Sequence, residues 1–146
     1  MEIVIKKFDQ LTTKELYEIL KVRADVFIVE QNCPYQDMDD KDFKAYHIYL
    51  KEDGKIKAYT RVLPQNVSFK EASFGRVLTL ERKKGYGEIL VKEAIKVAKE
   101  KFGADRIKIG AQAHAKNFYI KYGFVEDSEE YILDYIYHLD MVLDLK

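Results

Sequence analysis

Phe74–Phe102 reads FGRVLTLERKKGYGEILVKEAIKVAKEKF and predicts a strand, a basic glycine turn and a long helix. The strand covers Phe74–Leu80, the turn Arg82–Gly87 and the helix Glu88–Phe102. Glycine permits backbone angles that other residues avoid and lets a ligand approach the main chain closely. The first N–H groups of a helix have no partner inside it, and the helix dipole is positive at that end. The turn therefore predicts an anion site, for which a phosphate or diphosphate is the natural ligand.

The spacing of the glycines decides which phosphate ligand is expected. The turn lacks the pattern of the phosphate-binding loop in nucleotide hydrolases, and Leu90 stands where the dinucleotide fingerprint needs its third glycine. What remains is R-x-x-G-x-G after a strand, with Arg82, Lys83 and Lys84 as adjacent positive charges. This turn resembles the diphosphate-binding loop of the GNAT acetyltransferase superfamily, which binds acetyl-CoA. The alternative is a tight turn between strand and helix with a solvated basic rim.

The composition limits the classes of protein to which the chain can belong. Its 146 residues fit one domain, 1–146, and 47% hydrophobic residues suffice for a buried core. The 25 basic and 25 acidic residues balance, which argues against a nucleic-acid partner bound through a basic face. Cys33 is the one cysteine, so neither an internal disulfide nor a cysteine-rich zinc site is expected. No apolar run has membrane-spanning length and Met1–Lys6 has no secretory pattern, so we expect a cytoplasmic protein without a membrane partner.

The remaining elements are predicted from local patterns. Glu2–Phe8 alternates as a strand, and a capping box of Thr12 and Glu15 opens a helix. Further elements are expected at Ala45–Leu50, Lys55–Leu63, Arg106–Ala111, His114–Tyr122, Phe124–Val125 and Tyr135–Leu145, with a hairpin turn at Asp53-Gly54 and a helix stop at Gly103. The run Asp37–Asp42 lacks the glycine of a calcium loop, so it is interpreted as a solvated loop or short helix. This order of elements indicates an α/β domain, with a mixed sheet and helices on both faces.

Regular alternation predicts how the central strand presents its side chains. One face is expected to carry Phe74, Arg76, Leu78 and Leu80, and the other Gly75, Val77 and Thr79. Arg76 would then lie on a buried strand, where its charge needs a partner. It is expected either to orient a carboxylate in a pocket or to anchor a salt bridge.

A second pattern lies after the predicted strand Arg106–Ala111. Gln112 stands seven residues before Tyr119, and Gly123 follows that tyrosine by four. This spacing resembles the second signature of the GNAT superfamily. The segments Val26–Tyr35, Gly75–Val77, Gln112–His114 and His138–Met141 further resemble the ElaA-type subgroup, so the resemblance covers nearly the whole chain. Two positions depart from that subgroup, Lys84 where arginine is common and Glu81 where proline is common, but lysine keeps the charge.

The resemblance implies a GNAT acyl-CoA N-acyltransferase fold. Its mixed, mostly antiparallel sheet splays open at a central parallel strand pair, here Phe74–Leu80 and Arg106–Ala111. It also implies that acetyl-CoA is the donor and that an amine attacks it directly while both substrates are bound. No metal is expected. The cofactor-binding residues implied by the resemblance are Leu78, Thr79, Leu80, Arg82, Lys83, Lys84, Gly85, Tyr86, Gly87, Glu88, Gln112 and Asn117.

The resemblance also implies roles for individual side chains in acetyl transfer. Tyr119 is implied as the general acid that protonates the departing thiolate, and the alternative is that its ring only packs under the sheet. Glu30 is the candidate base for the amine proton, with His138, His114 or a chain of waters as alternatives. Cys33, Arg76 and His138 are expected to contact the acceptor.

The acceptor itself carries no signature that the sequence reveals. We expect a small-molecule or peptide amine as partner and a protein that is a monomer or a homodimer. One alternative function is a non-catalytic acyl-CoA-binding module on the same scaffold, which would not need Tyr119. Another is a protein-interaction domain, which the 11 tyrosines and 8 phenylalanines would favour if they formed an exposed patch.

Overall fold

A computed structural model describes residues 1–82 and 84–146, so the prediction for Lys83 lies outside the described residues. The first sheet has the strand order β1-β2-β3-β4, and the second has the order β5-β8-β6, with β7 paired to β8. The strands are β1 (Glu2–Lys7), β2 (Tyr46–Glu52), β3 (Lys55–Leu63), β4 (Ser73–Thr79), β5 (Arg106–Gln112), β6 (Val125–Glu126), β7 (Tyr131–Leu133) and β8 (Ile136–Asp144). The helices are α1 (Thr13–Arg23), α2 (Tyr86–Phe102) and α3 (Lys116–Ile120), with 3-10 turns η1 (Phe8–Gln10), η3 (Lys41–Lys44) and η4 (Ala113–Ala115) and a π-helical segment η2 (Ala24–Glu30).

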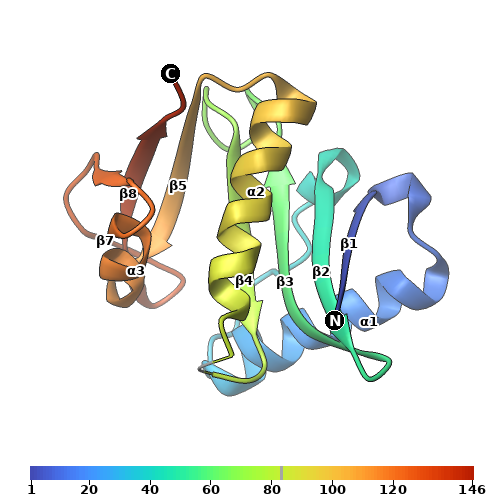
Figure 1. Cartoon of the computed structure of the whole chain (residues 1–146). Coiled ribbons are helices and arrows are strands. Elements are labelled where there is room, and N and C mark those ends of the chain that lie inside the picture. The colour runs from blue at the N-terminus through green and yellow to red at the C-terminus, as the bar shows by residue number, and fades with distance from the viewer. Residues whose placement is uncertain (83) are drawn as a thin grey trace.

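The two sheets meet at one end of β4 and β5 and separate from there. In the part of the chain that the structure describes, one isolated parallel bridge joins them, between Ala72 and Ile107, next to which Lys108 N donates to Ala72 O at 3.0 Å. Figure 1 shows β4 and β5 running in the same direction and separating towards the end where α2 begins. The pairs within each sheet are antiparallel. The predicted sheet, mostly antiparallel and splayed at a central parallel pair, is therefore confirmed.

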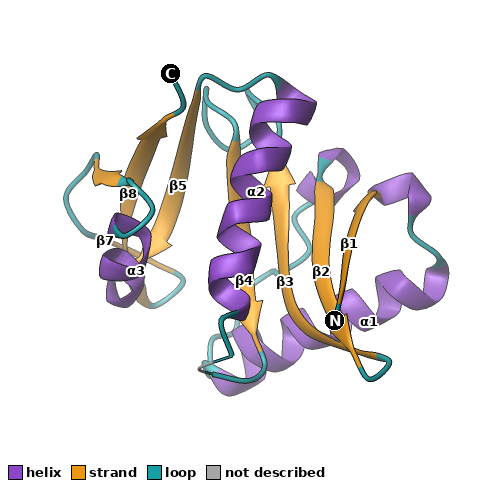
Figure 2. Ribbon diagram, viewed as in Figure 1, coloured by secondary structure: helices purple, strands orange, loops and turns teal. Residues whose placement is uncertain are grey.

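Helices cover both faces of the first sheet, with α2 on one face and α1 on the other (Figure 2). The core under α2 includes Ile48, Val62, Phe74, Leu90, Ile107 and Met141. The smaller core under α1 includes Ile19, Phe27, Tyr49, Ile56, Tyr59 and Leu78. Burial of apolar side chains is the main stabilising contribution, and the core under α2 contains residues of both sheets. That core therefore joins the two sheets beyond their single bridge.

The alternation predicted for the central strand is wrong, because β4 contains a bulge. Arg76 has φ of 52°, in the left-handed region, and the pairing of β4 with β3 shifts register there. A bulge adds one residue to one strand, so the side chains that follow it change face. Phe74 and Val77 accordingly pack in the core under α2, whereas Leu78 packs in the core under α1.

Signals for helix and hairpin ends are confirmed. Thr12 Oγ1 accepts from Glu15 N at 3.1 Å, and Glu15 Oε1 accepts from Thr12 N at 2.9 Å, which completes the predicted capping box. Asp53 and Gly54 join β2 to β3 with φ of 53° and 75°, the positive values that tight hairpin turns need. Gly103 ends α2 with φ of 58°.

Most strand ends differ from the predictions by one or two residues, and some elements differ more. α2 begins at Tyr86 rather than Glu88, and the helix expected over His114–Tyr122 is a 3-10 turn followed by the short α3. β7 has no counterpart among the predicted strands. Of the helices in the described residues, none is both long enough and apolar enough to cross a membrane.

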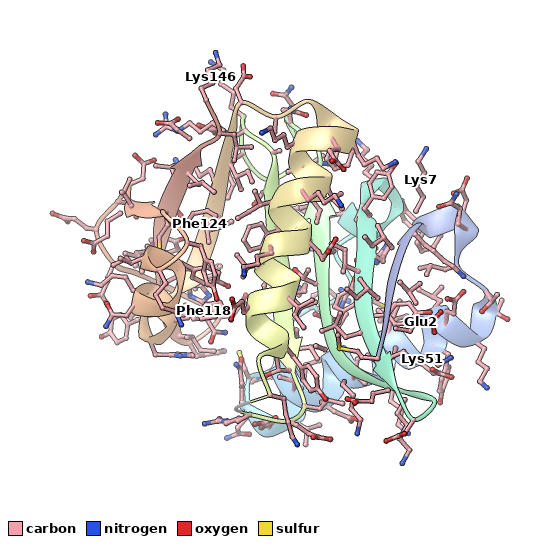
Figure 3. All side chains as sticks on the ribbon, viewed as in Figure 1. Glu2, Lys7, Lys51, Phe118, Phe124 and Lys146 are labelled. Carbon is pink, nitrogen blue, oxygen red and sulfur yellow. The ribbon has the colours of Figure 1, made fainter. Side chains whose placement is uncertain are left out.

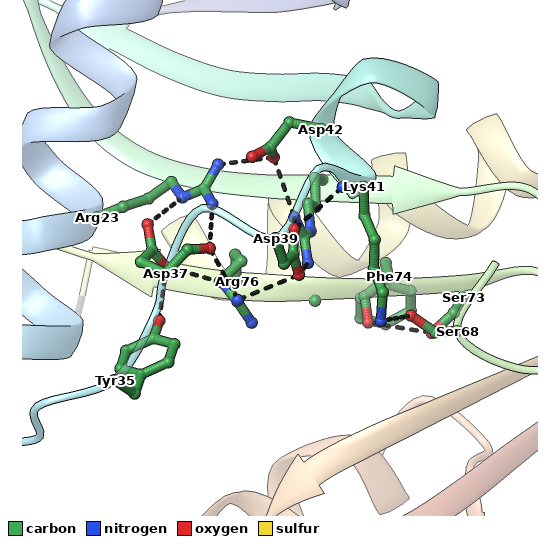
Figure 4. Close-up of polar contacts among 12 residues, drawn as sticks. Arg23, Tyr35, Asp37, Asp39, Lys41, Asp42, Ser68, Ser73, Phe74 and Arg76 are labelled. Atoms are coloured by element: carbon green, nitrogen blue, oxygen red, sulfur yellow. Dashed lines mark hydrogen bonds and ion pairs between the residues drawn. The ribbon is translucent and has the colours of Figure 1, made fainter. Parts of the chain in front are cut away.

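The run Asp37–Asp42 was predicted as a solvated loop or short helix, and its end does enter the short 3-10 turn η3. The expected solvation is wrong for Asp37 and Asp42, which are buried, because this segment supplies the carboxylates of a buried ion-pair ring. The ring, named here the Arg–Asp ring, closes in the order Arg23, Asp37, Arg76, Asp39, Arg61, Asp42 and back to Arg23. Its N···O distances lie between 2.6 and 3.3 Å. Its arginines come from α1, β3 and β4, and its aspartates come from the segment that precedes β2. Figure 4 shows Arg23 and Arg76 with the three aspartates.

Pairing within the Arg–Asp ring compensates the burial of its charges. The side chains of Arg23 and Arg61 are 0% and 4% exposed, and a charge that is so buried is tolerated only when it is paired. Burial by itself would raise the pKa of Asp39, but Arg61 and Arg76 outweigh it and hold the pKa well below its ordinary value. Burial likewise opposes ionisation of Asp42, and hydrogen bonds from Arg23 and Arg61 lower the pKa of that carboxyl. The ring therefore stabilises the ionised form of Asp39 and Asp42 in the folded state.

The ring and its neighbour His47 predict a loss of stability in acid. Burial lowers the pKa of His47, whose ring nitrogens contact Tyr59 Oη at 2.7 Å and Asp42 O at 3.0 Å. Below pH about 6.5 the unfolded chain takes up a proton at this histidine and the folded chain does not, so stability falls by up to about 1.4 kcal/mol per pH unit. Near pH 4 a second loss begins, because the lowered pKa values of Asp39 and Asp42 leave the folded state with fewer protons than the unfolded state.

Urea denaturation at several pH values measures both losses. His47→Gln should remove the slope between pH about 6.5 and 5 and leave the loss near pH 4. A free energy of unfolding that stays constant from pH 7 to 5 in the unsubstituted protein would contradict the assignment to His47.

Candidate active site

An open cleft of about 600 Å³ lies where β4 and β5 separate. Its walls come from the ends of both strands, the start of α2, the helix α3, the chain after η2 and the hairpin of β7 and β8. β4 and β5 are neighbours at the junction of the two sheets, and each is the last strand on its side of that junction. Their main-chain groups that face the cleft are therefore open to a ligand that lies between the sheets.

The start of α2 forms part of the cleft wall. Gly85, Tyr86, Gly87 and Glu88 line the cleft, and no side chain of the described residues caps the helix. Gly85 has φ of 74°, which glycine adopts without strain. The first N–H groups of the 17-residue helix have no partner inside it, so they are available to an anion in the cleft.

The side chains around this helix start favour a negatively charged ligand. Arg82 and Lys84 both line the cleft. The two nearby carboxylates, Glu81 and Glu88, are each paired with a lysine at 2.8 Å. Both carboxylates thus already have a lysine partner, whereas Arg82 and Lys84 form no ion pair within the described residues. The predicted anion-site residues that the structure describes therefore come together at one place in the cleft wall, and anion binding there stays a prediction.

The second glycine of the turn brings α3 close to the start of α2. A Cβ atom placed on Gly87 would lie 3.2 Å from Phe118 Cζ, which is closer than most real contacts of this kind. Figure 3 shows Phe118 between α3 and the first turns of α2. A larger residue at position 87 would separate the two helices, so Gly87 helps to set the distance from the anion site to α3.

Tyr119 is positioned by α3 to face the cleft. It is 7% exposed, and its ring packs edge-on against Phe118 and Phe124 with centroids 5.2 and 5.8 Å apart. Within the described residues the hydroxyl has no hydrogen-bond partner, yet it is not among the fully enclosed unpaired atoms, so it opens to the cleft that the residue lines. Burial raises the pKa of Tyr119 well above its ordinary value, so the hydroxyl stays protonated at neutral pH and can donate.

Three further predicted site residues, Glu30, Cys33 and His138, line the same cleft. Glu30 is exposed at the end of η2, and buried Cys33 donates through Sγ to Asp134 O at 2.8 Å. His138 Nδ1 lies 2.8 Å from Ile136 O. A carbonyl oxygen can only accept, so Nδ1 donates this hydrogen bond, and Nε2 has no hydrogen-bond partner within the described residues.

Gln112 and His114 also line the cleft, but their side chains contact one another. His114 Nε2 lies 2.6 Å from Gln112 Oε1. The Gln112 amide also contacts the Gln31 amide at 3.4 Å. Gln112 thus connects the end of β5 to the chain after η2 across the cleft.

Two predicted site residues do not reach the cleft wall in the described part of the chain. Leu80 N donates to Lys57 O at 2.8 Å, so this main-chain donor is used inside the first sheet. Asn117 is exposed on α3 and is not a lining residue. The structure also adds lining residues for which sequence reasoning had no signal, namely Tyr35, Leu133 and Asp134. Tyr35 lies in irregular chain and Asp134 in a hairpin turn without glycine, where neither periodicity nor turn composition marks a site, and Leu133 ends β7, a strand that was not predicted.

Comparison with known proteins gives matches over nearly the whole chain. A family model described as "Acetyltransferase (GNAT) domain" matches residues 12–145. A UPF0039 protein of Schizosaccharomyces pombe is 37% identical over 149 residues, which cover 99% of this chain and 98% of the relative. Protein ElaA of Escherichia coli is 34% identical over 140 residues, which cover 93% of this chain and 92% of ElaA.

Solved structures match the arrangement of the elements as well. The crystal structure of Escherichia coli ElaA has a TM-score of 0.91 with 32% sequence identity, over 98% of this chain and 99% of that chain. The crystal structure of an acyl-CoA N-acyltransferase from Pseudomonas aeruginosa has a TM-score of 0.91 with 34% identity, over the same shares of the two chains. The cleft described above therefore lies in a fold that these proteins share.

Proposed function

Because this chain belongs to the GNAT acetyltransferase family, and so to a family of acyltransferases, we propose that it transfers the acetyl group of acetyl-CoA to an amine. The acceptor is proposed to be a small molecule or a peptide. The observation that carries the proposal is the open cleft between β4 and β5, with the uncapped start of α2 in its wall. If the diphosphate of acetyl-CoA binds at that helix start, the rest of the extended molecule can lie between the separated strands β4 and β5.

The cleft contains the types of group that would bind an acyl-CoA, namely N–H donors, cations and main-chain groups of a strand. The diphosphate would accept from the N–H groups at Tyr86–Glu88 and lie beside Arg82 and Lys84. The amide groups of the donor arm would pair with main-chain groups near Leu78 and Thr79, on the cleft side of β4. When bound, acetyl-CoA supplies the activated acyl group and a thiol leaving group. The residues of this chain must supply the proton transfers.

Tyr119 is proposed as the proton donor to the sulfur atom that leaves. Its hydroxyl opens to the cleft, and a tyrosine hydroxyl is protonated at neutral pH even without a shift of its pKa, so it has a proton to donate at this place. As the amine nitrogen bonds to the acyl carbon, the bond from that carbon to sulfur breaks. The hydroxyl proton then goes to sulfur, and the tyrosine regains a proton from water.

The amine must lose a proton as it becomes an amide. Glu30 is proposed as the group that takes this proton, because it is an exposed carboxylate in the cleft wall. His138 is the second candidate, because Nδ1 donates to Ile136 O and Nε2 has no hydrogen-bond partner within the described residues. A pH profile of Glu30→Gln beside that of His138→Gln distinguishes them, since removal of the base alters the limb that reports its ionisation.

A pair of glycine substitutions tests donor binding. Gly85 and Gly54 have nearly equal φ values of 74° and 75°, and a Cβ atom at either position would have no atom of the described residues within 4 Å beyond its chain neighbours. Alanine at either position should therefore cost a similar stability of about 1–2 kcal/mol, from the left-handed backbone alone. Only Gly85→Ala places a methyl group at the proposed diphosphate site, so we expect its affinity for acetyl-CoA to fall about tenfold.

Isothermal calorimetry measures the affinity of each variant for acetyl-CoA. Thermal unfolding checks that Gly85→Ala and Gly54→Ala lose a similar amount of stability. Gly54→Ala, whose turn joins β2 to β3, should keep the affinity of the unsubstituted protein. Equal affinities in the two variants would reject the helix start as the diphosphate site. If the unsubstituted protein showed no binding at high micromolar concentration, the proposed function would be rejected as well.

A further inference from the structure

We propose that Arg76 binds a carboxylate of the acceptor, so that the acceptor is an amino acid or another small amine that also carries a carboxylate. This inference rests on the proposed function for the transfer step. The carboxylate site itself can be tested without turnover, as set out below.

The hydrogen bonds of Arg76 leave one end of its guanidinium free. Nε donates to Asp37 Oδ1 at 2.9 Å, and Nη2 donates to Asp37 O at 3.0 Å and to Asp39 Oδ2 at 3.3 Å. Nη1 has no partner in the described part of the chain. In Figure 4 one terminal nitrogen of Arg76 carries no dashed line and points away from the Arg–Asp ring. The donors on that nitrogen are available to a ligand.

Arg76 is the member of the Arg–Asp ring that reaches the cleft. Its side chain is 23% exposed, against 0% for Arg23 and 4% for Arg61. Arg76 lines the cleft, and the other two arginines are not among its described lining residues. The ring therefore presents one guanidinium, through its free end, to whatever occupies the cleft.

The surroundings of Arg76 hold that guanidinium in one orientation. The bulge in β4, with φ of 52° at Arg76, sets the direction of the side chain, and Asp37 and Asp39 fix Nε and Nη2. The ring of Tyr35 lies over one face, 5.3 Å from Arg76 Cζ. A donor group that is already ordered loses little entropy when it binds a ligand. Nη1 should therefore bind an acceptor oxygen more favourably than the mobile side chain of a lysine would.

Arg76 shares its charge within the Arg–Asp ring, whose three guanidinium groups and three carboxylates balance, so what it offers a ligand is the unpaired Nη1 donor group rather than an excess charge. Asp37 also pairs with Arg23 at 2.9 Å, and Asp39 also pairs with Arg61 at 2.6 Å. Each of these carboxylates thus divides its charge between two guanidinium groups. A ligand carboxylate at Nη1 would make a charge-assisted hydrogen bond, which is stronger than one between neutral groups.

The opposite end of such an acceptor has partners in the same cleft. Glu30 and Asp134 are exposed carboxylates that line it, and Nε2 of His138 has no hydrogen-bond partner in the described part of the chain. These groups attract an ammonium and accept a proton from it, whereas Arg76 attracts a carboxylate. A cleft with both kinds of group suits a molecule with both charges. A polyamine would leave Nη1 of Arg76 without an acceptor.

Matched acceptor pairs test the inference by turnover. Each pair is an amino acid and its carboxamide, which share the amine and the side chain and differ in the carboxylate. With acetyl-CoA and the unsubstituted protein, we expect kcat/KM to favour the acid of a pair by about tenfold. Arg76→Gln should bring the ratio of acid to amide close to one, and Arg76→Lys should restore part of it, because lysine keeps a charge without the fixed geometry.

A ring variant controls for a structural role of Arg76. Asp42→Asn weakens the Arg–Asp ring at Arg23 and Arg61 and leaves both carboxylate partners of Arg76, Asp37 and Asp39, in place. It should lower stability, and with it kcat/KM for both members of a pair, without changing their ratio. If Arg76 only supported the fold, Arg76→Gln would behave in the same way, and that result would overturn the inference.

Binding without acetyl-CoA separates this inference from the proposed function. Calorimetry with N-acetyl amino acids should give a Kd at least tenfold lower than with the corresponding N-acetyl amino-acid amides, and the difference should vanish in Arg76→Gln. This pattern would support the carboxylate site even if acetyl-CoA did not bind. Equal affinity for acids and amides in the unsubstituted protein would overturn the site even if acetyl-CoA bound and was turned over.

Discussion

Replacing Arg23 with leucine is expected to lower the free energy of unfolding by about 3–5 kcal/mol. The side chain of Arg23 is 0% exposed and pairs with Asp37 at 2.9 Å and with Asp42 at 2.7 Å. Leucine would fill part of the space but leave two buried carboxylates without one of their partners. The cost arises from those uncompensated charges, because a complete buried pair is itself worth little compared with apolar packing. Urea denaturation gives the free energy, and an unchanged slope with denaturant would show that both states keep their compactness.

A neighbouring position on α1 provides the control. Lys21 is exposed two residues earlier on the same helix, so Lys21→Leu should change the free energy by less than about 0.5 kcal/mol. A cost below about 1 kcal/mol for Arg23→Leu would mean that the Arg–Asp ring does not close in solution. Partial recovery when Asp37→Asn is added to Arg23→Leu would identify the buried carboxylate as the source of the cost.

Replacing Tyr119 with phenylalanine is expected to lower kcat by about 10²–10³-fold and to leave the affinity for acetyl-CoA unchanged. The substitution removes only the hydroxyl, which has no partner within the described residues, so the packing of the ring on Phe118 and Phe124 stays. The proton for the leaving sulfur then has to come from water. Release of free CoA thiol with a mixed panel of amines measures the rate, and calorimetry measures donor affinity.

Tyr46→Phe is the matched control for Tyr119→Phe. Tyr46 is also partly buried and packs on the core under α2, with its ring 5.4 Å from that of Phe102, but it does not line the cleft in the described residues. Its variant should keep the full rate. Equal rates in Tyr119→Phe and the unsubstituted protein would mean that Tyr119 only packs in the core and does not donate a proton. Tight donor binding without turnover on any amine in the unsubstituted protein would instead favour a non-catalytic acyl-CoA-binding module.

The predictable parts of the fold are those that depend on residues close together in the sequence. The capping box of Thr12 and Glu15 and the stop at Gly103 depend on residues within a few positions of one another. The hairpin at Asp53-Gly54 is equally local. The splayed sheet is different, because it depends on contacts far apart in the chain, and only the resemblance of two spaced signatures to a known family made it predictable.

The errors came from features that local patterns do not encode. Alternation assumes an unbroken register, so the bulge at Arg76 inverted the expected faces of the strand after it. The acidic run Asp37–Asp42 has the composition of a solvated loop, but it is drawn into the core by Arg23 and Arg61, which come from distant elements. Charge balance among residues so far apart cannot be read from spacing.

The candidate site divides in the same way. Its donor side was predictable, because the glycine turn and Tyr119 have motif spacing, and most of these residues do line the cleft. Its acceptor side was predictable only in part. Tyr35 and Asp134 lie in irregular chain and in a turn, so only the three-dimensional arrangement brings them to the cleft.

The single bridge at Ala72 and Ile107 has a consequence for the choice of donor. Two sheets bonded at one end can differ in the angle between them, and a change of that angle alters their spacing most at the far end. Ala72 is fully buried and lies outside the set of described residues that line the cleft. A bulkier residue there would tilt one sheet against the other and widen the space between the strands. Tolerance of longer acyl chains in this fold can therefore arise from a core position that never contacts the thioester.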